Sequence, residues 1–220
     1  MRPSCSSGNY GHCDRQWLAD VDGDGDLDFF FSYAGYYRIY QLMNDGNGGW
    51  STSQEGSSVK NGLTTTHKGG MRMAFADLDG NGSPDLVTGT SRGNPMGAKV
   101  YLNMDGQGGF EHIDSGGLAV GTSPTALVTG DVNGDGTIDV VVASASTSPI
   151  AVYLNDPPPV TFSPAPPMTI TTDVKLSWGA VSGDFNSDGS IDIISLDHKS
   201  GGGGTLYTND GYGNPLFDLM

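Results

Sequence analysis

Short apolar runs, rich in β-branched and aromatic residues, recur along the chain at nearly regular intervals. The runs are Phe29-Phe30-Phe31, Leu86-Val87-Thr88, Val140-Val141-Val142 and Ile193-Ile194. Runs of this length and composition are typical of strands that are buried on both faces. Each run directly follows a polar segment of nine residues, so the pattern predicts that the polar segment joins two strands.

The four polar segments, named loops one to four, share one pattern of oxygen-bearing side chains and glycine. Asp or Asn stands at positions 1, 3, 5 and 9, and glycine fills position 6, where a sharp turn needs φ > 0. The oxygen-bearing residues are Asp20, Asp22, Asp24 and Asp28; Asp77, Asp79, Asn81 and Asp85; Asp131, Asn133, Asp135 and Asp139; and Asp184, Asn186, Asp188 and Asp192.

This donor set predicts about four Ca2+ ions, one in each loop. Calcium takes roughly 6–8 oxygen ligands at about 2.3–2.6 Å, and alternate side chains of a curling chain point towards one centre. Asp, Asn and Gly also form ordinary turns, but four copies in one register favour the metal site. Position 7 is expected to add a backbone carbonyl oxygen, from Asp26, Ser83, Thr137 and Ser190.

The flanking residues exclude an EF-hand. That motif requires an acidic side chain at position 12. Position 12 is here Phe31, Thr88, Val142 or Ser195.

The loops also define a repeat. They begin at residues 20, 77, 131 and 184, so the intervals are 57, 54 and 53 residues. A second motif keeps the same spacing and ends in an aromatic anchor, which is Trp50, Phe110, Phe162 or Phe217. In the third unit, strands are expected at 126–130, 138–145, 150–155 and 162–170. Four-stranded units of this length predict an all-β fold, either a β-propeller or a partial propeller of four blades, at about 12–66, 67–120, 121–173 and 174–220.

Two blades depart from the pattern. Prolines follow Asn155, and because proline cannot donate to a strand ladder, the last strand of blade three is expected at an outer edge. Only three residues follow Phe217, so blade four is predicted to lack its final strand. Residues 2–10 could complete it, the chain could be a fragment, or another subunit could complete the ring. Unmet blade edges favour self-assembly.

The motif Asp-x-Asn/Asp-Gly-Asp-Gly-x-x-Asp, followed by an apolar strand and then Leu-Asn-Asp-Gly-x-Gly-Phe, resembles the FG-GAP or VCBS-type repeat. The resemblance covers nearly the whole chain. It implies a propeller like that of the integrin α-subunit N-terminus, which some fungal lectins share, with calcium ligands at the positions given above. Asn81, Asn133 and Asn186 replace Asp and are expected to weaken their sites.

Composition narrows the function. The net charge is −15, and 14 of the 25 acidic residues lie in the four loops, so the acidity belongs largely to the metal sites. No basic stripe could neutralise phosphate, which excludes nucleic acid. No apolar run is long enough to insert into a membrane. Residues 1–12 lack the apolar core of a signal peptide.

An extracellular or cell-surface location is expected. In that setting, Cys5 and Cys13 are expected to form a local disulfide.

Candidate chemistry beyond the loops is sparse. The four histidines occupy different places in the repeat and form no triad or metal motif, so no catalysis is expected. Aromatic residues of the first strands are expected in the core between blades, and three tyrosines are candidates for a ligand-contact surface. The residues are His12, His67, His112 and His198; Trp17, Phe75 and Trp178; and Tyr36, Tyr37 and Tyr212.

The function expected from the sequence is recognition or adhesion through a glycan or protein ligand. A structural subunit of an extracellular filament or coat is one alternative. An accessory propeller of a larger enzyme is the other.

Overall fold

The computed structural model describes twelve parts of the chain: 13–33, 39–52, 71–90, 97–113, 118, 124–144, 150–156, 160–162, 168–170, 177–197, 203–209 and 218–219. All the regular secondary structure in these parts is β-strand, which confirms the all-β prediction. No described element is a helix of the length and apolarity needed to cross a membrane.

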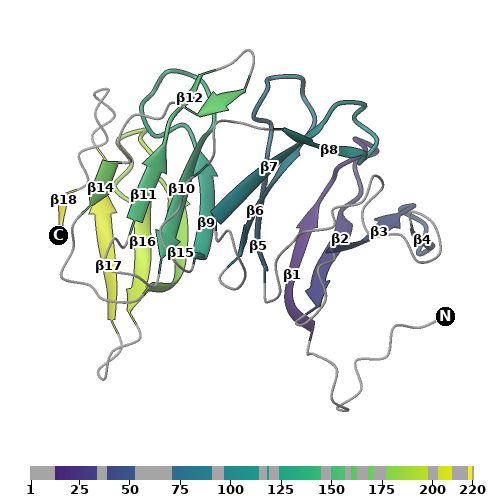
Figure 1. Ribbon diagram of the computed structural model, residues 1–220, viewed down its shortest axis with the longest axis horizontal. Helices are drawn as coiled ribbons and strands as arrows, with labels where there is room; N and C mark the ends of the chain where they lie inside the picture. Colours follow the sequence, from purple (N-terminus) through teal and green to yellow (C-terminus); the bar gives the residue numbers. More distant parts are fainter. Residues whose placement is uncertain are drawn as a thin grey trace.

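Four antiparallel sheets of four strands follow one another along the chain, and we name them blades one to four (Figure 1). Blade one contains β1 (Cys13–Ala19), β2 (Asp28–Tyr33), β3 (Ile39–Asn44) and β4 (Trp50–Thr52). Blade two contains β5 (Met71–Ala76), β6 (Asp85–Thr90), β7 (Gly97–Asn103) and β8 (Phe110–Ile113). In both, the acidic loop joins the first two strands, as predicted.

Blade three has the strand order β14-β11-β10-β9. Its strands are β9 (Pro124–Gly130), β10 (Asp139–Ser144), β11 (Ile150–Tyr153) and β14 (Met168–Ile170). A separate two-stranded hairpin of β12 (Asn155–Asp156) and β13 (Thr161–Phe162) stands beside them. Of the strand predicted over 162–170, Phe162 belongs to β13 and 168–170 form β14. The residues between them lie outside the described parts of the chain.

Blade four contains β15 (Ser177–Gly183), β16 (Asp192–Asp197), β17 (Gly203–Thr208) and β18 (Asp218–Leu219). The prediction that this blade lacks its final strand is wrong, because Leu219 pairs with Tyr207 and Asp218 with Thr208. Two residues suffice for an edge strand but are too few to show alternation in a sequence. The predicted blade boundaries and residues 2–10 lie outside the described residues.

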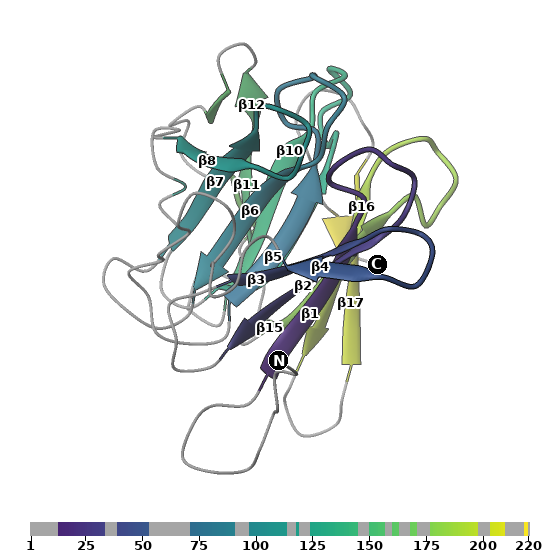
Figure 2. The ribbon, with the colours of Figure 1, turned by 90° about the vertical axis from the view of Figure 1, so that its right-hand side faces the viewer.

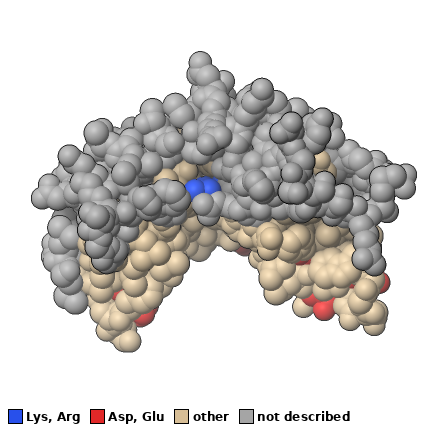
Figure 3. Space-filling view, turned by 90° about the horizontal axis from the view of Figure 1, so that it is seen from below, with Lys and Arg blue, Asp and Glu red and all other residues tan. Residues whose placement is uncertain are grey.

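The blades stack in chain order, so that β1, β5, β9 and β15 are neighbours along the inside of the stack (Figures 1 and 2). Seen from below, the molecule is an arch with a hollow on one side (Figure 3). The chain thus forms a partial β-propeller.

Each blade has a leading face towards the preceding blade and a trailing face towards the next, since side chains alternate along a strand. Between blades one and two, Phe30 on the trailing face packs against Phe75 on the leading face, with ring centroids 4.6 Å apart. Trp17 and Phe75 pack against this interface, which confirms their predicted place in the core. Equivalent clusters fill the interfaces between blades two and three and between blades three and four.

Candidate metal centres

Each loop is folded around the carboxylate at position 1. In loop three, Asp131 Oδ1 accepts hydrogen bonds from the amides of Gly134 (2.7 Å) and Asp135 (3.2 Å). Its Oδ2 accepts one from Gly136 (2.8 Å). Gly136 at position 6 has φ of 88°, and its three equivalents have φ between 90° and 93°, so glycine is required there for the reason predicted.

Position 4 is glycine in the first three loops and Ser187 in loop four. Ser187 has φ of 64°. A side chain in this left-handed region is strained by roughly 1–2 kcal/mol. Loop four thus keeps the geometry of the others at some energetic cost.

The carboxylate at position 9 forms the buried base of each loop. Asp139 is fully buried; its Oδ2 accepts the Val132 amide (3.0 Å) and its Oδ1 the Asn155 amide (2.8 Å). Asp28, Asp85 and Asp192 accept the same pair of bonds, one from the amide of position 2 and one from the amide of the Asn at the end of the third strand or just after it. Position 9 therefore ties the loop to the third strand of its own blade.

Burial shifts the pKa of three of these aspartates, Asp28, Asp85 and Asp139. It raises the pKa of Asp85 and of Asp139 to about 6, although the hydrogen bonds from the backbone amides act in the opposite direction. Burial also raises the pKa of Asp28. Holding these carboxylates ionised without a cation is therefore unfavourable.

The structure brings positions 1, 3 and 9 together in the first two loops. Asp20, Asp22 and Asp28 each offer one carboxylate oxygen, and these three oxygens lie within 4.8 Å of one another. Asp77, Asp79 and Asp85 form the same arrangement in loop two. Burial raises the pKa of Asp22, and the negative charges of Asp24 and Asp20 raise it further.

Loops three and four differ at position 3, where an amide replaces the carboxylate. Asn133 and Asn186 each donate Nδ2 to the Oδ2 of the Asp at position 5, at 2.7 Å in both loops. These two loops therefore bring two carboxylates, at positions 1 and 9, where the first two bring three.

Positions 5 and 7 are bonded to each other. Asp24, Asn81, Asp135 and Asp188 each accept the amide of position 7 through Oδ1, at 2.8–2.9 Å. Asp24 lies outside the gathered group of loop one. The side chains at position 7 turn towards other parts of the blade: Thr137 Oγ1 bonds Asp135 Oδ1 and the Asn155 carbonyl, and Asp26 and Ser83 pack on Gly46 and Gly106. The carbonyl ligands at position 7 of all four loops, Ser190 included, remain a prediction.

The gathered residues fit calcium. Every donor is an oxygen, and the three carboxylates of each group repel one another unless a cation lies between them. Asp20, Asp22 and Asp28 would hold the ion in loop one, and Asp77, Asp79 and Asp85 in loop two. A bound ion would offset their charge and fasten the loop to the buried base.

An asparagine clamp between blades was not predicted. Asn103 Nδ2 donates to the Val21 carbonyl in loop one of the preceding blade (2.7 Å) and to the Pro84 carbonyl in its own blade (3.3 Å). Asn155 and Asn209 make the same contacts to Leu78 and Val132. The signal was the Asn at the end of the apolar segment in each repeat, which a glycine-rich turn follows in three of the four.

A groove of about 450 Å3 lies between loops one and two, where the first strands of the two blades meet. Leu18, Asp20 and Gly23 line one side, and Phe75, Ser83 and Pro84 line the other. It combines apolar surface with carboxylate and hydroxyl oxygens.

Several sequence predictions remain untested by the geometry. His112 is exposed and packs edge-on against Tyr101, at 5.2 Å between ring centroids. The other histidines, the three candidate tyrosines, Cys5 and Phe217 lie outside the described residues. The side chains of Cys13 and Trp178 also lie outside, so the disulfide stays a prediction.

Three overlapping stretches, residues 20–88, 77–142 and 131–195, match the model of the FG-GAP-like repeat. A solved structure of an Agrocybe aegerita lectin is similar to the chain, with 25% sequence identity and a TM-score of 0.57. That structure is described as the basis of specific recognition of non-reducing terminal N-acetylglucosamine. The match covers 95% of this chain and 52% of the lectin chain. No curated protein sequence matches the chain.

Proposed function

The chain belongs to the FG-GAP-like repeat family, and on this basis we propose that it is a calcium-binding propeller that recognises a glycan outside the cell. The observation that carries the proposal is the similarity to the Agrocybe aegerita lectin over 95% of this chain. Since the chain spans about half the length of that lectin, the recognition of a terminal N-acetylglucosamine is proposed here only as the first ligand to test.

The groove between loops one and two is the proposed contact surface. A sugar ring presents C–H groups on its faces and hydroxyl groups around its edge. Phe75 and Pro84 offer apolar contact, while Asp20 and Ser83 offer hydrogen-bonding oxygens beside them. Small ligands bind in concave sites that combine apolar lining with a few polar groups in this way.

A calcium ion in loop one would help to shape the proposed sugar site, because the groove is lined by residues of loops one and two. Asp20 lines the groove and also belongs to the gathered carboxylates of loop one. An ion held there would fix the position of Asp20 and the conformation of loops one and two.

The extracellular location and the absence of catalysis belong to the same proposal. Extracellular calcium modules bind with dissociation constants of about 10⁻⁴–10⁻³ M, which suits the calcium concentration outside cells. The carboxylates described above are engaged in hydrogen bonds or gathered for an ion. The Thr137 hydroxyl, which donates to Asp135 in loop three, does not line the groove.

A glycan array probed with the whole chain tests the proposal. We expect binding to glycans with a non-reducing terminal N-acetylglucosamine in millimolar calcium and its loss in chelator. Binding that persists in chelator would contradict the role of calcium, and absence of glycan binding in calcium would contradict the recognition role.

Two serines at the same loop position locate the site. Ser83, at position 7 of loop two, lines the groove, whereas Ser190, at position 7 of loop four, does not. Ser83→Ala should weaken sugar binding in a titration, and Ser190→Ala should leave it unchanged. Equal effects of the two substitutions would place the site elsewhere.

A further inference from the structure

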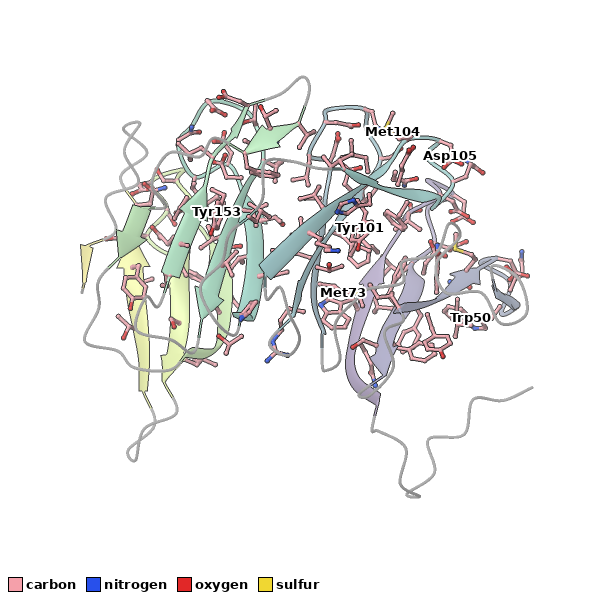
Figure 4. All side chains as sticks on the ribbon, viewed as in Figure 1. Trp50, Met73, Tyr101, Met104, Asp105 and Tyr153 are labelled. Carbon is pink, nitrogen blue, oxygen red and sulfur yellow. The ribbon has the colours of Figure 1, made fainter. Side chains whose placement is uncertain are left out.

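Exposed apolar side chains are concentrated at the two ends of the arch. In the described part of the chain, seven large hydrophobic side chains are exposed. Six of them lie on the leading face of blade one or the trailing face of blade four: Leu18, Leu27, Trp50, Val181, Phe185 and Leu196. The seventh, Met104, lies on the turn after β7 (Figure 4).

On the trailing face of blade four, these residues occupy positions that are buried in the other blades. Phe185 stands at position 2 of loop four and is 45% exposed. Its equivalents Val21, Leu78 and Val132 are at most 1% exposed, because each is covered by the next blade. Val181 pairs with Ile194 as Val128 pairs with Val141, and the latter pair is buried against blade four.

The leading face of blade one shows the complementary pattern. Trp50, which pairs with Asn44, is 52% exposed. Phe110, which pairs with Asn103 in blade two, is 1% exposed because blade one covers it. Trp50 is thus the exposed one among the three described anchors, because none of the described blades covers it.

The two end faces are the two halves of the contact that the chain makes three times internally. Between blades one and two, Phe30 meets Phe75. On the trailing face of blade four, Ile194 is equivalent to Phe30, because each stands two residues after position 9 of its loop. On the leading face of blade one, Leu18 is equivalent to Phe75, because Leu18 pairs with Phe29 and Phe75 pairs with Leu86. Asn44 corresponds to the clamp residue Asn103, and the Phe185 carbonyl corresponds to its acceptor on Val21.

We propose that two copies of the chain bind head to tail, with the trailing face of blade four of each copy against the leading face of blade one of the other. The stack already curves into an arch with its ends separated by a hollow (Figure 3). A head-to-tail contact generates a ring when the rotation closes. Two copies of four blades would give eight, which is within the range of about 4–8 typical of propellers.

The proposal does not depend on glycan recognition. An assembly without sugar binding, or sugar binding without assembly, would separate the two.

The test is the mass of the whole chain in calcium-containing buffer, measured by light scattering and sedimentation. We expect twice the 22.9 kDa of one chain. Trp50→Lys and Leu196→Lys each place a charge in the contact, from opposite faces, and each should weaken the dimer by roughly tenfold or more. Met104→Lys is the matched control, because Met104 is the exposed apolar residue on neither face, and it should leave the mass unchanged.

Mixing the two variants distinguishes a head-to-tail contact from a symmetric one. The unaltered faces of the two variants, blade four of one and blade one of the other, can still form one contact, so the mixture should recover a dimer that neither variant forms alone. Circular dichroism of each variant checks that it remains folded. A folded wild type at 22.9 kDa at every concentration, or a dimer sensitive to only one of the two faces, would overturn the proposal.

Discussion

Aspartates at the outer edge of a loop and the aspartate at its base differ in what surrounds them. In loop one, Asp20 and Asp22 are partly exposed, whereas Asp28 is fully buried and accepts two backbone amides. All three offer oxygens to one centre. The same side chain thus serves the fold at the base and is available to an ion at the edge.

The comparison shows that one spacing motif can supply two kinds of aspartate, one that stabilises the fold and one that is available to bind an ion. The base positions, all fully buried, join the loop to its own blade. Of the two edge positions, Asp20 also accepts amides of its own loop, whereas Asp22 accepts the Asp24 amide at 3.4 Å. We therefore expect substitutions at the base to act with or without calcium, and substitutions at position 3 to act mainly through calcium.

The largest effect is expected at the buried base of loop three. Asp139→Ala leaves the amides of Val132 and Asn155 buried without acceptors. Each such group costs about 1–3 kcal/mol, so the free energy of unfolding should fall by about 2–6 kcal/mol. Urea denaturation in calcium-free buffer measures it.

The control for this change lies in the same loop. Asp135 is exposed, and Asp135→Ala should lower the free energy of unfolding by about 1 kcal/mol or less. Similar losses for both variants would remove the distinction between base and edge.

The asparagine clamp extends the base across two blades. Asn103→Ala removes the bonds to the Val21 carbonyl and to the Gly108 amide, both of them buried contacts. We expect a loss of about 1–3 kcal/mol in urea denaturation. Asn44→Ala, at the equivalent position in blade one, should cost less in dilute solution, because none of the described blades lies against it. An equal loss at both positions would show that the clamp does not act between blades.

At the edge of loop one, Asp22→Asn should change stability little in chelator and reduce the stabilisation by calcium. One site contributes about 1.4 kcal/mol at a calcium concentration tenfold above its dissociation constant. Thermal denaturation with and without calcium gives the difference. Asp24→Asn is the control, since Asp24 lies outside the gathered group, and it should reduce the calcium effect less.

The smallest effect is a dependence on pH in calcium-free buffer. Burial raises the pKa of Asp85 and Asp139 to about 6 in the folded chain, whereas an unfolded Asp titrates near 3.9. Between about pH 4 and pH 6 the folded state binds more protons, so stability should fall as pH rises.

Calcium should weaken or reverse this slope, because it requires the ionised carboxylates. Thermal denaturation across this pH range, with and without calcium, measures both slopes. Stability that rises with pH in the absence of calcium would contradict the pKa directions given above.

The sequence was sufficient for the features that depend on short-range patterns. Nine residues specify each loop, and a buried run of three specifies the strand that follows, so four blades could be predicted. The gathering of Asp20, Asp22 and Asp28 also follows from local spacing.

Features that depend on a neighbouring blade could not be predicted. The Asn103 clamp reaches a carbonyl 82 residues away. Trp50 is exposed because blade one lies at the end of the described stack. The sequence motif around Trp50 is the one that is repeated in the other blades, so it does not indicate this position. The two residues of β18 carry no pattern that a strand prediction could use.

The account rests on the presence of calcium in the acidic loops, and an anomalous difference map from crystals grown in millimolar calcium tests it most directly. We expect a peak in each loop, between the carboxylates at positions 1 and 9, with the strongest peaks beside Asp22 and Asp79, where three carboxylates gather. Loops that keep their fold but show no peak in any of the four blades would contradict the account.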